Sequence, residues 1–254
     1  MKIATWNVNS LKVRLPQVVA WLEEARPDVL AIQETKLADE QFPRAAFEDA
    51  GWHVAFSGQK TYNGVAIVAR TAPTDVVTDL PDADDPQRRI LGATVDGVRL
   101  YNLYVPNGKE VDSDKYRYKL EWLERMRAHL AGELARHPRL AVVGDFNIAP
   151  ADADVHDPDA LAGRIHCSEA ERAALARLEA IGLRDTFRLF DQPARSFSWW
   201  DYRANAFRRD LGLRIDLVLA SETLAGTCRG CRIDARPRGN ERPSDHAPVI
   251  AEFE

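Results

Sequence analysis

The chain has 254 residues, 45% of them hydrophobic, and a formal net charge of −5. This length suits one large domain or two small ones, and the hydrophobic share is ordinary for a protein with a buried core. No segment approaches the roughly 20 apolar residues that span a bilayer, and the first residues contain no apolar signal-peptide core. The sequence therefore predicts a cytoplasmic protein with no membrane segment, and we expect a monomer.

Short runs rich in β-branched and aromatic residues follow one another along the chain, separated by turn residues. Three segments, at Arg14–Ala25, Tyr116–Arg136 and Ser168 to about Ile181, are predicted helices, and the last begins with a capping-box pattern. The segment Thr71–Gln87 is rich in Pro and Asp and is expected to be a surface loop. The predicted strands are Ile3–Val8, Val29–Glu34, His53–Phe56, Val65–Ala69, Arg89–Val95, Arg99–Val105, Leu140–Phe146, Ser196–Trp200, Ile215–Ala220 and Pro248–Phe253.

Many strands in series and few helices favour two packed sheets over a doubly wound parallel sheet. No Pro-, Gly- or Ser-rich linker divides the chain, and no repeat or low-complexity tract interrupts it. We therefore predict a single domain over residues 1–254.

The charges are distributed unevenly. Five aspartates and no Lys or Arg lie between Gly144 and Asp159, whereas nine arginines and five acids lie between Arg203 and Arg242. An acidic patch beside an arginine-rich segment suits a site that holds a cation next to a phosphodiester. Ordinary solvated surface charge explains the same pattern, so charge alone leaves both interpretations open.

The three cysteines cannot form a disulfide framework, and an odd number fits a reducing compartment. Cys228 and Cys231 form a CxxC pair, which His166 and Cys167 would complete as a zinc site. We favour the alternative interpretation, in which the cysteines are small, reduced and partly buried thiols.

Six polar clusters interrupt the ends of predicted strands. One carboxylate at a strand end usually has no function, but six such clusters in one domain are harder to explain in that way. Oxygen donors are the ligands that Mg²⁺ prefers, together with substrate phosphate and water, and Glu34 is the best candidate. The clusters are Thr5–Asn9, Ile32–Lys36, Tyr104–Gly108, Val143–Asn147, Arg214–Asp216 and Ser244–His246.

Competing catalytic motifs are absent from the sequence. It contains no P-loop, no GxGxxG, no GxSxG and no HExxH. Metal-assisted hydrolysis is therefore the leading reaction class.

Five motifs resemble, in order, those of the bacterial exonuclease III family of the endonuclease/exonuclease/phosphatase superfamily. With the first strand, they cover essentially the whole chain. The resemblance implies a four-layer α/β (α+β) sandwich, with two mainly antiparallel β-sheets packed face to face, helices outside and an active site at one rim. The motifs are Ile32–Lys36, Gly144–Asn147, Ser196–Arg203, Leu213–Asp216 and Ser244–Pro248.

The resemblance also implies how a metal and a water molecule are held. Glu34, with Asn7 and Asp245 close by, would hold Mg²⁺, or Mn²⁺ as a substitute, against a phosphate oxygen. Asp145 would orient and deprotonate the attacking water, and Asn147 would fix its position. Asp145 and Asn147 are also expected near the metal.

Three further residues complete the implied site. His246 would contact the scissile phosphate, with Asp216 holding the imidazole and favouring its charged form. In an alternative account this His–Asp pair is the general base, and the sequence does not decide between the two. Tyr104 would donate a hydrogen bond to the phosphate or to the leaving oxygen.

The aromatic and basic segment Ser196–Arg203 indicates DNA as the substrate. Exposed aromatic and arginine side chains can wedge into a duplex or line a pocket for an extruded sugar. In the family, the tryptophan that matches Trp199 helps to line the pocket for an abasic deoxyribose, and Arg203 follows it closely. The loop residues expected to approach backbone phosphates are Lys60, Asn63, Arg88 and Arg89.

The resemblance implies a Mg²⁺-dependent DNA phosphodiesterase of base-excision repair. Such an enzyme cleaves duplex DNA 5′ to abasic sites and removes nucleotides or blocking groups from 3′ ends. One alternative keeps the chemistry but acts on a lipid or inositol phosphate, and another is a catalytically silent nucleic-acid-binding relative. The aromatic segment argues against the first alternative, and the intact set of catalytic positions argues against the second.

Overall fold

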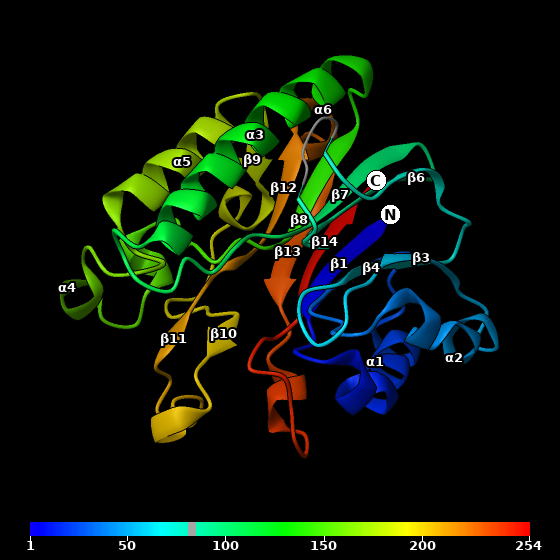
Figure 1. Ribbon diagram of the computed structural model, residues 1–254, viewed down its shortest axis with the longest axis horizontal. Helices are drawn as coiled ribbons and strands as arrows, with labels where there is room; N and C mark the ends of the chain where they lie inside the picture. Colours follow the sequence, from blue (N-terminus) through cyan, green and yellow to red (C-terminus); the bar gives the residue numbers. More distant parts are fainter. Residues whose placement is uncertain (81–84) are drawn as a thin grey trace.

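The computed structural model describes residues 1–80 and 85–254 (Figure 1). Each of the ten predicted strands overlaps an observed strand. The strands are β1 Lys2–Asn7, β2 Val29–Gln33, β3 His53–Ser57, β4 Val65–Ala69, β5 Thr74–Val77, β6 Ile90–Val95, β7 Val98–Tyr104, β8 Leu140–Asp145, β9 Leu183–Asp185, β10 Trp199–Trp200, β11 Gly212–Leu213, β12 Asp216–Ser221, β13 Cys228–Ile233 and β14 Val249–Phe253.

Four of the described helices, α3 to α6, begin at side-chain caps that the sequence contains. The Ser113 hydroxyl accepts from the Tyr116 amide at the start of α3, and Ser168 and Glu171 form the predicted capping box of α5. No helix of the described residues is both long and apolar enough to cross a bilayer. The helices are α1 Leu11–Ala25, α2 Arg44–Glu48, α3 Asp114–Arg136, α4 Pro158–Leu161, α5 Glu169–Glu179 and α6 Glu222–Ala225, and the 3₁₀ turns are η1 Asp39–Gln41, η2 Asp152–Asp154, η3 Thr186–Leu189, η4 Arg203–Asn205 and η5 Arg236–Gly239.

The strands form two six-stranded sheets and a separate two-stranded ribbon, β10–β11. The first sheet has the order β13-β14-β1-β2-β4-β3, and the second has the order β5-β6-β7-β8-β12-β9. Each sheet contains one parallel pair, β1–β2 or β7–β8, because α1 and α3 carry the chain back across the sheet between these strands. All other pairs within the two sheets are antiparallel, so the prediction of mainly antiparallel sheets is confirmed.

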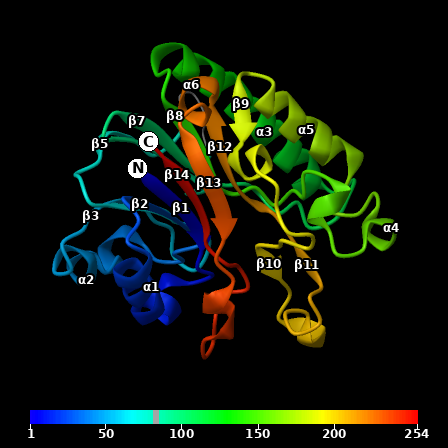
Figure 2. The ribbon, with the colours of Figure 1, turned by 180° about the vertical axis from the view of Figure 1, so that it is seen from behind.

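Four layers of structure result. α1 and α2 cover the outer face of the first sheet, and α3 and α5 cover the outer face of the second (Figure 1), which the reverse view confirms (Figure 2). The inner faces of the sheets pack on each other through small and branched side chains such as Val29, Ile67, Leu91, Val143 and Val218. The predicted four-layer sandwich is therefore confirmed.

The strands β5, β9, β11 and β13 were not predicted. The segment Thr71–Gln87 is not wholly a surface loop, because β5 (Thr74–Val77) lies within it as an edge strand; residues 81–84 of that segment lie outside the described residues. The pairing of β5 with β6 is irregular between Thr74 and Val77, and Asp75 has a φ of 50°. An irregular, largely exposed edge strand lacks the alternating pattern on which strand prediction depends.

The CxxC pair lies in β13, which was also not predicted. A bulge between Cys228 and Gly230 shifts the alternation of side chains, so that Cys228 and Cys231 both face the core between the sheets. Cys167 packs in a different apolar cluster, and His166 lies beside Asn147. The structure therefore does not assemble the zinc set considered from the sequence, and the thiols are buried rather than partly buried.

Candidate active site

The predicted polar clusters meet at one edge of the two sheets. Asn7, Tyr104 and Asp145 are the last residues of β1, β7 and β8, and Glu34 directly follows β2. Asp216 begins β12, which runs antiparallel to β8 and pairs Asp216 with Asp145. Because β1 is parallel to β2 and β7 is parallel to β8, the carboxyl ends of these four strands and the start of β12 share this edge. The β10–β11 ribbon and the segment before β14 extend from the same end of the molecule (Figure 1).

Asn7 connects the two sheets across the site. Its Nδ2 donates to Glu34 Oε1 and to Asp145 Oδ2, both at 2.9 Å. Its Oδ1 accepts from the Asn9 amide at 2.9 Å, and its carbonyl accepts from Ser244 Oγ at 2.7 Å. Asn7 is fully buried, so one amide group, itself held on every side, sets the separation of the two carboxylates.

His246 faces both Asp216 and Asp145. Its Nδ1 lies 2.9 Å from Asp216 Oδ2, and its Nε2 lies 3.8 Å from Asp145 Oδ2. Burial alone would lower the pKa of the imidazole, but the charges of Asp216 and Asp145 outweigh it and raise this pKa to about 10. Burial is also the main cause that raises the pKa of Asp145 to about 7, against the opposing effect of His246. The site thus combines a cationic ring with two buried acids.

Asn147 holds the Asp145 carboxylate from the other side. Its backbone amide donates to Asp145 Oδ1 at 2.9 Å, and its Nδ2 lies 3.2 Å from Asp145 Oδ2. Asn147 has a φ of 51° and Glu34 a φ of 54°, in the left-handed region that asparagine tolerates and glutamate avoids. Such conformations persist where the surroundings enforce them, typically at functional sites.

Tyr104 lies beside the carboxylates. Burial raises the pKa of its hydroxyl well above the ordinary value, and the charges of Glu34 and Asp145 raise it further. The Arg89 guanidinium lies 4.7 Å from the centre of the Tyr104 ring and donates to the Tyr104 carbonyl at 3.3 Å. The hydroxyl therefore keeps its proton and remains a hydrogen-bond donor.

Asp245 connects the acidic cluster to Trp199. Its Oδ1 accepts from Asn9 Nδ2 at 2.9 Å, and its Oδ2 accepts from Trp199 Nε1 at 3.0 Å. Burial raises the pKa of Asp245, but the charge of His246 and these two bonds outweigh it and keep this pKa below its ordinary value. The indole predicted to line a sugar pocket is thus attached to the same cluster.

The remaining residues predicted to contact DNA differ in their surroundings. Lys60 and Arg203 are exposed, and Arg203 is ion-paired with Asp201. Arg88 pairs with Asp79, at 2.8 Å, and the Asn63 side chain is buried. Of the six residues predicted to contact DNA, the structure brings Trp199, Arg89 and, through its carbonyl, Asn63 into contact with other site residues.

Four polar residues of the site had no predicted role there. Lys36 Nζ lies 2.8 Å from Glu34 Oε2 and 2.5 Å from Asn9 Oδ1, and both residues belong to motifs that were recognised. Lys119 and His166 contact the Asn147 carbonyl from distant parts of the chain. Lys119 has no signal in the sequence beyond its polarity, and His166 was considered only as a zinc ligand, so neither was assigned to this site.

The donor set suits a hard divalent cation. Among the described residues one group, Asp145, Asp216 and His246, has ligand atoms within 4.8 Å of one another. His246 already binds Asp216 through Nδ1, however, and magnesium prefers oxygen to imidazole. Glu34 offers further carboxylate oxygens, linked to Asp145 through Asn7. Oxygen donors at the edge of the sheets therefore fit a magnesium ion better than the imidazole does.

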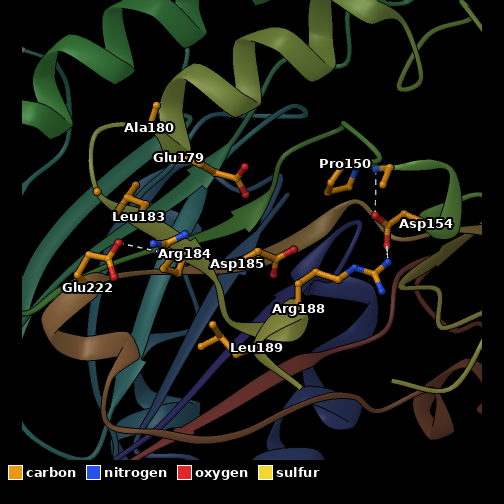
Figure 3. A pocket seen from close by; sticks show the side chains of 12 residues that line it. Pro150, Asp154, Glu179, Ala180, Leu183, Arg184, Asp185, Arg188, Leu189 and Glu222 are labelled. Carbon is orange, nitrogen blue, oxygen red and sulfur yellow. Dashed lines mark hydrogen bonds and ion pairs between the residues drawn. The ribbon is translucent and has the colours of Figure 1, made fainter. Parts of the chain in front are cut away.

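A cavity of about 640 Å³ lies elsewhere, along β9 and η3 (Figure 3). Arg188 is directed to Asp154 and Arg184 to Glu222, so four of its charged side chains are already paired. Burial raises the pKa of Glu179, which also lines the cavity, to about 7. The lining contains none of the predicted site residues.

Comparisons with known proteins identify the family. Residues 4–246 match the Endonuclease/Exonuclease/phosphatase family. Exodeoxyribonuclease III of Haemophilus influenzae is 36% identical, with all of both chains covered. A Neisseria 3′ phosphatase, NExo, solved with a product DNA hairpin, is 50% identical over 100% of this chain and 99% of its own, with a TM-score of 0.98. An AP endonuclease from Archaeoglobus fulgidus is 42% identical over 100% of this chain and 99% of its own, with a TM-score of 0.96.

The family match and the fold agree with the order of the motifs along the chain and with the edge at which they meet. The protein belongs to the exonuclease III and AP endonuclease branch of the endonuclease/exonuclease/phosphatase superfamily, and it is a hydrolase of that kind.

Proposed function

We propose that the protein is a Mg²⁺-dependent phosphodiesterase that acts on duplex DNA in base-excision repair. It hydrolyses the phosphodiester 5′ to abasic sites and removes nucleotides or blocking groups from 3′ ends. One observation carries the proposal: Asn7 joins Glu34 to Asp145 by hydrogen bonds, and His246 Nε2 lies 3.8 Å from the same Asp145 carboxyl group, so that oxygen donors and an imidazole lie within reach of one phosphate group.

Glu34 would hold the magnesium ion, with Asn7 and Asp245 near it. Asp145 and Asn147 would supply further oxygen atoms from the second sheet. Bound there, magnesium neutralises the charge that grows on a non-bridging phosphate oxygen.

Asp145 orients the attacking water and takes its proton. Three donors fix the carboxylate, namely Asn7 Nδ2 and the backbone and side-chain amides of Asn147. A carboxylate fixed in this way holds the water in line with the phosphorus, and Asn147 helps to position it.

His246 contacts the scissile phosphate through Nε2, because Nδ1 is bound to Asp216. A cationic ring between two carboxylates is better suited to binding a phosphate oxygen than to accepting a proton, which favours Asp145 over the His–Asp pair as the general base. Tyr104 donates its hydroxyl hydrogen to the phosphate or to the leaving oxygen.

Duplex DNA as the substrate is supported by the aromatic face of Trp199 beside the site and by the basic residues around it. Arg89, Arg203 and Lys60 contact backbone phosphates in this proposal. The NExo structure was solved with a product DNA hairpin, and the Haemophilus relative is an exodeoxyribonuclease.

The test uses two labelled duplexes, one with a single abasic-site analogue and one with a recessed 3′ end, each with and without Mg²⁺. We expect product only with the metal, and a fall of at least about 10³-fold for Asp145→Asn and for His246→Ala. Glu124→Gln, at an exposed position, is the control and should cleave normally. Undiminished cleavage by Asp145→Asn would refute the assigned role in water activation.

A further inference from the structure

A buried lysine that the proposed reaction does not use lies beneath the site. Lys119 of α3 is fully buried in an ion pair with Glu171 of α5, which is equally buried. Its Nζ also donates to the Asn147 carbonyl at 2.7 Å and to the Asn107 carbonyl at 3.2 Å. All three ammonium hydrogens therefore have acceptors.

These bonds hold a residue in an unusual conformation. Asn147 has a φ of 51°, and its carbonyl lies 2.7 Å from Lys119 Nζ and 2.6 Å from His166 Nδ1. Its side chain is held at both ends, because Oδ1 accepts from Asn107 Nδ2 and Nδ2 donates to the Val105 carbonyl, each at 3.0 Å. The left-handed backbone is thus enforced by long-range contacts.

Asn147 in turn orients Asp145. Its backbone amide and its side-chain amide each donate to a different oxygen of that carboxylate. A shift of the Asn147 backbone would move both donors together, and the carboxylate would turn with them. Lys119 therefore acts on Asp145 through one intermediate residue and does not touch the space where the phosphate binds.

Stability alone does not call for this arrangement. Replacing a buried ion pair with apolar groups of similar volume is often neutral, whereas removing one partner strongly destabilises the fold. We propose that Lys119 is a positioning residue for phosphodiester hydrolysis, which fixes the Asn147 backbone and through it the Asp145 carboxylate. This inference rests on the proposed function.

The test separates the ion pair from the bond to Asn147. Lys119→Met leaves Glu171 as a buried, unpaired charge, and Lys119→Met combined with Glu171→Gln removes that charge while an oxygen remains for Ser168. Glu171→Gln alone keeps the bond from Lys119 to Asn147. The matched control is Arg99→Met with Glu133→Gln, a buried pair at the opposite end of β7.

We expect kcat to fall about 100-fold in Lys119→Met and in the double variant, with KM changed less than about threefold. The thermal midpoint should fall in the single variant and recover in the double variant, whereas Glu171→Gln and the control pair should keep kcat. A double variant with kcat within about threefold of the wild type would overturn the inference, as would an equal loss of kcat in the control pair. A wild type that cleaves no duplex with Mg²⁺ would overturn the proposed function and this inference together.

Discussion

Replacing Asn7 with alanine removes the one amide that joins the carboxylates of the two sheets. Its Nδ2 donates to Glu34 Oε1 and to Asp145 Oδ2, both at 2.9 Å, from a fully buried position. Both acceptors are carboxyl oxygens that the proposed reaction uses, and the amide fixes both of them at once. Their loss should therefore reduce the rate more than the stability.

The structure sets the size of both effects. A hydrogen bond to a charged group contributes about 1.5–3 kcal/mol, so two of them set an upper limit of about 3–6 kcal/mol. Water that enters the space left by the amide offsets part of this, and we expect a loss of about 3–4 kcal/mol in the transition state, or about 10²–10³ in kcat/KM. The orphaned Asn9 amide and the closer approach of two acids should cost about 1–3 kcal/mol of folding free energy. For a chain of this size, each kcal/mol lowers the melting temperature by about 2–4 °C.

The assay measures steady-state cleavage of the abasic-site duplex at saturating Mg²⁺, with a thermal melt of the same samples. Asn240→Ala, an exposed asparagine, is the control and should change neither quantity. If Asn7→Ala keeps more than about a third of the wild-type kcat/KM while Mg²⁺ is saturating, the two carboxylates do not need the amide, and the reasoning fails.

Three further outcomes follow from the geometry. Trp199→Ala should raise KM for the abasic-site duplex about tenfold with a smaller effect on kcat, as expected for loss of a stacked sugar contact; an unchanged KM would argue against that contact. EDTA should abolish cleavage, and Glu34→Gln should raise the Mg²⁺ concentration for half-maximal rate at least about tenfold, so an unshifted titration would contradict its role as a ligand. Burial alone would raise the pKa of Glu133, but hydrogen bonds from Tyr101 and two arginines outweigh it and lower this pKa to about 2. Because the unfolded value is about 4.3, the stabilisation from Glu133 is complete above that pH and is lost as the pH falls toward 2. Urea midpoints should drop over this window in the wild type and less steeply in Glu133→Gln; parallel profiles would count against the assignment.

The fold could be predicted because its signals are local and recur in order along the chain. β2 and β8 are apolar runs that end in polar motifs, and the Ser168 capping box marks the start of α5. β13 escaped prediction because its bulge turns two cysteines three residues apart to the same face, which no regular strand does. β5 escaped because it is short, mostly exposed and at an edge.

Some residues of the site could be predicted from the sequence, and others could not. Glu34, Asp145 and His246 lie at strand ends within recognised motifs, and the structure brings them together. Lys119 and His166 reach the site only through tertiary packing, and their sequence surroundings carry no comparable signal. Side-chain pairings within loops, such as that of Arg88 with Asp79, also depend on the folded chain and not on the local sequence.

In the proposed mechanism a divalent cation binds where Glu34 and Asp145 approach each other. Anomalous diffraction from crystals soaked in Mn²⁺ tests it most directly, because the ion itself is located. We expect a peak at coordination distance from oxygens of both carboxylates, and no such peak in Glu34→Gln crystals. The enzyme used for the crystals must cleave DNA with Mn²⁺. A peak only in the cavity lined by Glu179 and Arg188 would then contradict a cation site between Glu34 and Asp145.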